Sequence, residues 1–110
     1  MKNTSDRLQQ LENFLADSPD DAFILFAIAK EHEGLQNTDE AIRFYRQLEK
    51  DHKDYVGTYY HLGKILEKEE GIDAAIKVYK DGMAVAKAQG DRHALSELAG
   101  AKMEIDEEDD

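Results

Sequence analysis

The sequence predicts an all-α protein. Between its glycines and capping residues, apolar side chains recur three or four positions apart, as they do on one face of an α-helix. The strict alternation of apolar and polar residues that is typical of a half-buried β-strand is absent from the sequence. The third observation is composition: 41% of the 110 residues are hydrophobic and one is proline, which favours an ordered single domain. We expect six helices, near residues 5–17, 20–34, 37–52, 54–70, 72–89 and 91–103.

Each of the first three predicted helices carries an apolar stripe. The segment Ser18-Pro19-Asp20-Asp21 predicts the start of the second helix, with Ser18 as its N-cap and Pro19 at its first position. Asn37 with Glu40 three residues later fits a capping box, which predicts the start of the third helix. The stripes consist of Leu8, Leu11, Phe14 and Leu15, then Leu25, Ile28, Ala29 and His32, then Ala41, Ile42, Tyr45 and Leu48.

Glycine and aspartate mark the boundaries of the later helices. Gly71 and Gly90 lie where helices end or restart, as Gly34 does earlier in the chain. Asp54 and Asp91 are suitable N-caps, because a carboxylate accepts hydrogen bonds from the free N–H groups of a first helical turn. The same marks therefore predict three further helices after residue 53.

The chain repeats itself after 34 residues. The segment from Ala41 to Arg46, Ala-Ile-Arg-Phe-Tyr-Arg, falls on the segment from Ala75 to Lys80, Ala-Ile-Lys-Val-Tyr-Lys. The segment Ile28-Ala29-Lys30 falls in the same way on Leu62-Gly63-Lys64. Matching charge, size and aromaticity in two helix pairs indicates two copies of one helix–turn–helix unit.

This repeat resembles the tetratricopeptide repeat (TPR) family. The resemblance implies a right-handed α-α superhelix of six antiparallel helices, in one domain over residues 1–103. Its 34-residue units lie near 22–55 and 56–89, between capping helices 5–17 and 91–103. Gly82 departs from the family pattern, and a helical glycine costs about 1 kcal/mol relative to alanine. The matching residues are Tyr59, Leu62, Gly63, Leu66, Ala75 and Tyr79 in one unit and, more loosely, Leu25, Ile28, Ala29, His32, Ala41 and Tyr45 in the other.

The resemblance implies a non-enzymatic protein-interaction module with no cofactor, which binds a peptide or protein segment in a concave groove. Phe23 and Phe26 fall off the core stripe of their helix, which independently marks them as candidate apolar anchors. Lys30 and Lys64 are equivalent in the two repeats and would suit an acidic, apolar peptide, although both fit ordinary surface lysines as well. The groove positions carried over from the family are Phe23, Phe26, Lys30 and Glu33, then Tyr60, His61, Lys64 and Glu67, then His93, Ser96, Glu97 and Gly100.

Charge and composition disfavour several other classes of protein. The net charge of −11 argues against nucleic-acid and anionic membrane partners. No apolar run is long enough to span a membrane and no signal peptide is evident, so we expect a cytoplasmic protein. There is no cysteine and no phosphate-binding or hydrolase motif, so we expect no enzyme. His61 and His93 lack the spacing of a metal site, and His32 on an apolar stripe is interpreted as a core residue.

Two features of the C-terminus leave alternatives open. Residues 104–110 hold six of the 25 acids and are expected to form a disordered acidic tail, either as a solvating appendage or as a ligand for Lys30 and Lys64. Apolar residues of the last helix, Leu95, Leu98 and Met103, offer a second function: self-association into a weak homodimer instead of a monomer.

Overall fold

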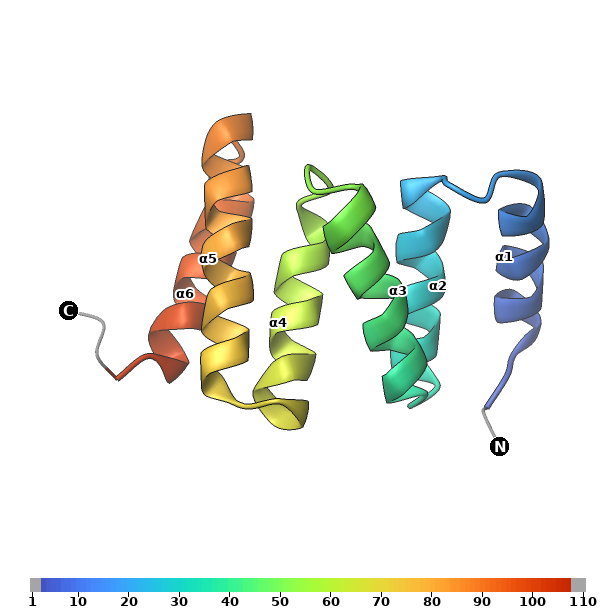
Figure 1. Cartoon of the computed structure of the whole chain (residues 1–110), viewed down its shortest axis with the longest axis horizontal. Coiled ribbons are helices and arrows are strands. Elements are labelled where there is room, and N and C mark those ends of the chain that lie inside the picture. The colour runs from blue at the N-terminus through green and yellow to red at the C-terminus, as the bar shows by residue number, and fades with distance from the viewer. Residues whose placement is uncertain (1–2, 108–110) are drawn as a thin grey trace. The chain divides into compact units, whose positions relative to one another are not determined.

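The computed structural model describes residues 3–107, and these form six α-helices and no strand (Figure 1). The all-α prediction is confirmed, and every predicted helix is present with its ends shifted by at most three residues. The helices are α1 (Asp6–Asp17), α2 (Ala22–Gly34), α3 (Thr38–Asp51), α4 (Gly57–Glu69), α5 (Ile72–Gln89) and α6 (Arg92–Ile105).

The helices group into two compact units. The first unit ends at His52 and holds α1, α2 and α3, with α2 packed against both of its neighbours. The second unit begins at Lys53 and holds α4, α5 and α6, which all pack against one another. Within each unit, consecutive helices run antiparallel and are joined by short turns (Figure 1). The single domain over residues 1–103 stays a prediction.

The core of the first unit holds most residues of the three predicted stripes, including a histidine, but Phe14 is 59% exposed, so its place in the first stripe was wrong. The side chain of His32 is 1% exposed, and its ring stacks on Phe44 with the centroids 5.7 Å apart. Its Nδ1 atom lies 3.0 Å from Nδ2 of Asn37. The interpretation of His32 as a core residue is therefore confirmed. The other core residues are Leu8, Leu11, Leu25, Ile28, Ala29, Ala41, Tyr45 and Leu48.

The predicted start of α2 at Ser18 and Pro19 is wrong. Ser18 ends α1 instead, because its N–H donates to the carbonyls of Phe14 and Leu15. The N-cap of α2 is Asp21, whose Oδ1 accepts from the N–H of Ile24 at 3.1 Å. Ser18, Pro19, Asp20 and Asp21 are all residue types that are common at the start of a helix, so the sequence left the first residue of α2 ambiguous. The turn that contains Pro19 precedes this helix.

Asn37 stands at the N-cap position of α3 but does not cap it with its side chain. Its amide group accepts from the N–H of Asn3 at 2.9 Å and donates to the carbonyl of Asn3 at 2.7 Å. These two hydrogen bonds orient the amide toward the backbone of Asn3, and its oxygen accepts no hydrogen bond from the first turn of the helix. Asp54 does not cap α4, which begins at Gly57, whereas Asp91 caps α6 as predicted, accepting from the N–H of Ala94 at 3.0 Å.

Two glycines allow α4 and α5 to pack closely in the second unit. A β-carbon on Gly63 would overlap the ring of Tyr79, and one on Gly82 would overlap Cβ of Tyr59. Each glycine thus faces an aromatic residue of the opposite helix. In the first unit, the positions equivalent to Tyr59 and Gly82 hold two buried leucines, Leu25 and Leu48. The small residue at position 82 therefore compensates for the large residue at position 59.

The last helix extends past the predicted start of the acidic tail. Residues 104 and 105 belong to α6, which corrects the expectation of disorder for these two residues. The helix is held at its end by Lys102, whose Nζ donates to Oδ2 of Asp106 at 2.8 Å, with both side chains mostly buried. This ion pair joins the last turn of α6 to Asp106, the residue that follows the helix. Asp106 and Glu107 follow the helix within the described residues, and the last part of the predicted tail, residues 108–110, lies outside them.

Candidate functional site

The first unit contains a hollow of about 390 Å³ beside α2, the first-unit hollow. Phe23 is 69% exposed and Phe26 is half-buried, with its ring edge-on to Tyr45 at a centroid distance of 6.0 Å. Core residues such as Leu25 take the opposite stripe of the same helix, as the sequence pattern predicts. The hollow is lined by Arg7 of α1 and by Phe23, Phe26, Ala27, Lys30 and Glu31 of α2.

Two cations and one carboxylate lie among these aromatic rings. The Lys30 ammonium lies 5.9 Å from the centroid of the Phe26 ring, which is within the range of a cation–π interaction. Nε of Arg7 lies 3.5 Å from Oε1 of Glu31, and the hydroxyl of Ser5 donates to Oε2 of the same carboxylate at 2.9 Å. Arg7 and Lys30 outnumber the single carboxylate of Glu31, which already has two partners, so the lining has a net positive charge. It also holds two aromatic rings.

The second unit contains a smaller hollow of about 180 Å³ between α4 and α6, the second-unit hollow. It brings together five of the groove positions carried over from the family. Two further residues, Ala101 and Glu104, complete it. The lining consists of Tyr60 and Lys64 from α4 and of Ser96, Glu97, Gly100, Ala101 and Glu104 from α6.

The charges around the second-unit hollow differ from those of the first. Nζ of Lys64 lies 3.6 Å from Oε2 of Glu67, so this lysine has a carboxylate partner one turn along its own helix. Nε2 of His93 lies 3.8 Å from Oε1 of Glu97, a pair that is charged on both sides only when the histidine is protonated. With Glu97 and Glu104 against Lys64, the lining carries a net negative charge.

Glu33 and Glu67, both predicted groove residues, bind buried tyrosines at equivalent places in the two units. The Tyr45 hydroxyl donates to Glu33 at 2.8 Å, and the Tyr79 hydroxyl donates to Glu67. Burial, and then the hydrogen bond to the nearby carboxylate and its charge, raise the pKa of Tyr45 far above its ordinary value. The same causes raise the pKa of Tyr79. These contacts give both glutamates a structural role that the sequence analysis did not assign to them.

Sequence reasoning placed some lining residues and missed others. Phe23, Phe26 and Lys30 line the first-unit hollow, and Tyr60, Lys64 and Glu97 line the second. Four predicted residues line neither hollow: Glu33, His61, Glu67 and His93. The residues missed are Arg7, Ala27, Glu31, Ala101 and Glu104. The helical spacing could have identified Glu104, since it falls seven residues after Glu97 and therefore on the same face of α6. The sequence analysis placed Glu104 in the acidic tail instead.

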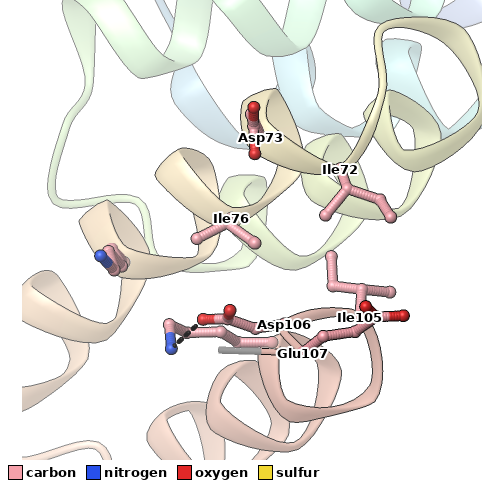
Figure 2. A pocket seen from close by; sticks show the side chains of 8 residues that line it. Ile72, Asp73, Ile76, Ile105, Asp106 and Glu107 are labelled. Atoms are coloured by element: carbon pink, nitrogen blue, oxygen red, sulfur yellow. Dashed lines mark hydrogen bonds and ion pairs between the residues drawn. The ribbon is translucent and has the colours of Figure 1, made fainter. Parts of the chain in front are cut away.

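A third hollow of about 660 Å³, the terminal hollow, lies between the start of α5 and the end of α6 (Figure 2). Ile72 and Ile105 point toward one another across it, beside Ile76 (Figure 2). Charged groups surround these isoleucines. The complete lining is Ile72, Asp73, Ile76, Lys80, Lys102, Ile105, Asp106 and Glu107.

The apolar surface predicted on the last helix is corrected in part. Leu98 is 1% exposed, because it packs into the core of the second unit beside Gly82, and Leu95 is half-buried. Only Met103 of the three residues named from the sequence is well exposed, at 68%. Ile72 of α5, which lines the terminal hollow together with Ile105, is 50% exposed as well.

Residues 3–107 offer neither a membrane-spanning helix nor a cluster of metal ligands. No helix in this range has the length and apolar character needed to cross a membrane. Within the same range, no three histidine, cysteine, aspartate or glutamate side chains gather in a way that could hold a metal ion.

Solved structures that are similar to the chain include three from two organisms. A tetratricopeptide repeat domain protein from Salinibacter ruber has a crystal structure that is 39% identical, covering 82% of this chain and 100% of that one, with a TM-score of 0.77. A solution structure of a tetratricopeptide repeat domain protein from the same organism is 40% identical, covering 83% and 92%, with a TM-score of 0.76.

The solution structure of a protein from Bordetella parapertussis is 22% identical, covering 93% of this chain and 89% of that one, with a TM-score of 0.78, and it supports the fold alone. No family model and no curated protein matches the sequence. The Salinibacter ruber protein is similar enough, over its whole length, to establish the family. The chain belongs to the tetratricopeptide repeat family.

Proposed function

We propose that this chain is a non-enzymatic module that binds a peptide or protein segment, with the first-unit hollow as its main contact. Membership of the tetratricopeptide repeat family supports a protein-interaction module in general. The finer assignment depends on the surface of α2, where Phe23, Phe26 and Lys30 lie on the face turned away from the core.

The exposed ring of Phe23 is the observation that carries this proposal. A phenylalanine that is 69% exposed at the rim of a hollow leaves apolar area in water that a ligand can cover. Phe26 offers a second apolar surface, and Lys30 and Arg7 supply positive charge beside it. This combination fits a segment that carries an apolar side chain next to an acidic one.

Peptide-display selection against the intact chain tests the proposal. We expect an enriched motif of apolar and acidic residues, and a Phe23→Ala variant to bind the enriched peptides at least tenfold more weakly, because truncation of an apolar anchor costs about 2 kcal/mol. Phe23 has little packing to lose, so the variant keeps its fold. Met103→Ala is the matched control, since it also shortens an exposed apolar side chain but lies outside all three hollows.

Equal binding by the parent chain and the Phe23→Ala variant would show that the first-unit hollow is not the contact. A folded chain that enriches no peptide would contradict peptide binding as a whole.

Self-association is the second candidate function. The terminal hollow is a better surface for it than the apolar face of the last helix that was predicted from the sequence. Ile72 is 50% exposed and faces Ile76 and Ile105 there. Light scattering over a range of concentrations is the test. If this face mediates dimer formation, the mass rises with concentration and Ile72→Glu abolishes the rise. A constant monomeric mass at high concentration would exclude this function.

A further inference from the structure

We propose that the second-unit hollow receives a lysine or arginine side chain from a basic segment of the bound partner. This inference rests on the proposed function, because it assumes that the chain binds a peptide or protein segment. It assigns a partner chemistry opposite to the acidic one that the sequence suggested for Lys64.

The size of the hollow favours one side chain over a small molecule. Its volume of about 180 Å³ lies below the roughly 300–1,000 Å³ that is usual for small-molecule pockets. It is open to solvent along the surface between α4 and α6, where a segment can lie with a single side chain inserted. Gly100 and Ala101 form part of the lining and present almost no side chain, which leaves room for an inserted one.

The charge in the hollow favours a cation. Glu97 and Glu104 are seven residues apart on α6, which places them on one face two turns from each other. Within residues 3–107, Glu104 forms no hydrogen bond or ion pair. The opposing charge of Lys64 is offset by Glu67 at 3.6 Å, so two carboxylates dominate the site.

An aromatic ring adds a second source of attraction for a cation. Tyr60 lines the hollow from α4, and a tyrosine ring attracts lysine or arginine through its electron-rich face. Guanidinium and ammonium groups are the side chains that can use a carboxylate and an aromatic face at the same time. The hollow therefore combines shape, charge and aromatic contact that all suit one class of side chain.

The charge of the whole chain acts in the same direction. With a formal net charge of −11, the molecule accelerates the approach of cationic segments and slows that of acidic ones. The first-unit hollow is the local exception, with its net positive lining. A partner that uses both hollows would therefore carry an acidic, apolar element and a separate basic one.

Fluorescence anisotropy on the full chain tests this inference with two labelled probes. The first is a short peptide of alternating lysine and leucine, and the second is its twin with glutamate in place of lysine. We expect Glu104→Gln to weaken binding of the lysine probe about threefold, and the Glu97→Gln, Glu104→Gln double variant about tenfold. Both side chains are exposed, so these variants keep the fold.

Two controls separate this effect from a general change in charge. Glu69→Gln removes the same charge from an exposed position on α4 outside the hollow, and we expect less than a twofold change. Lys64→Gln removes the opposing cation and is expected to tighten binding of the lysine probe about twofold. Because a role for Lys64 in holding acidic groups predicts no such tightening, the sign of this effect distinguishes the two accounts.

The inference would be overturned if Glu104→Gln and Glu69→Gln weakened binding of the lysine probe equally. Weaker binding of this probe by Lys64→Gln, or no binding of it by the parent chain, would overturn the inference as well. Failure of the proposed function gives a different result. It appears when the Phe23→Ala variant binds the display-selected peptides as tightly as the parent chain does. The variants of the second-unit hollow do not bear on that result. The two hypotheses can therefore fail separately.

Discussion

Replacing Gly82 with alanine is expected to lower the free energy of unfolding by up to about 2 kcal/mol. The new β-carbon would overlap Cβ of Tyr59 and lie 3.0 Å from Cδ1 of Leu98. Because Cβ of Tyr59 is fixed to the backbone of α4, the overlap is relieved only if α4 and α5 move apart. Overpacking of this kind costs about 1–3 kcal/mol, occasionally more, and the preference of a helix for alanine returns about 1 kcal/mol of it.

Urea denaturation followed by circular dichroism measures this loss. Gly100→Ala is the matched control, since a β-carbon there meets no atom within 4 Å and the substitution is expected to stabilise the chain by about 1 kcal/mol. If Gly82→Ala is as stable as the control, the close packing of α4 and α5 described above is wrong.

The second large effect is a loss of stability in alkaline solution. Tyr45 and Tyr79 have pKa values raised above the ordinary 10.0 by burial and by their glutamate partners. Below pH 10, the folded and unfolded states both keep the hydroxyl protons. Above it, the unfolded chain releases them while the folded chain retains them, so stability falls as pH rises. Each tyrosine contributes up to about 1.4 kcal/mol per pH unit.

Urea denaturation at several pH values between about 8 and 11 measures this slope. Lysines also titrate there, so the Tyr45→Phe and Tyr79→Phe variants serve as references, because each lacks one of the two hydroxyls. We expect each variant to lose stability less steeply above pH 10 than the parent chain does. Parallel pH profiles for the parent and both variants would show that neither hydroxyl remains protonated in the folded state.

Much of the fold is predictable from the sequence because the helical pattern is local. The spacing of residues such as Leu25 and Ile28 reports the buried face of a helix without knowledge of its neighbours. The repeat then extends this information from one helix pair to the other. The predicted cap at Asn37 failed for the opposite reason, since its side chain is bound by Asn3, a residue 34 positions away. Such distant hydrogen bonds leave no periodic signal in the sequence.

The candidate site shows the same division. Phe23 and Phe26 are predictable because they fall off the core stripe of α2. By contrast, Glu33 and Glu67 are surface-type residues in the sequence, and only the three-dimensional structure shows that each accepts a hydrogen bond from a buried tyrosine. The charge of the second-unit hollow depends on Glu104, which the sequence places in an acidic run and the structure places on the last helix.

Amide chemical-shift mapping with a display-selected peptide tests the central proposal most directly, since it reports every backbone position of the chain at once. We expect the largest shifts from this peptide on α2 around Phe23, Phe26 and Lys30, and we expect the lysine probe, mapped in the same way, to shift α4 and α6 around Tyr60. Largest shifts at the terminal hollow or on the exposed face of α3, with these residues unchanged, would contradict it.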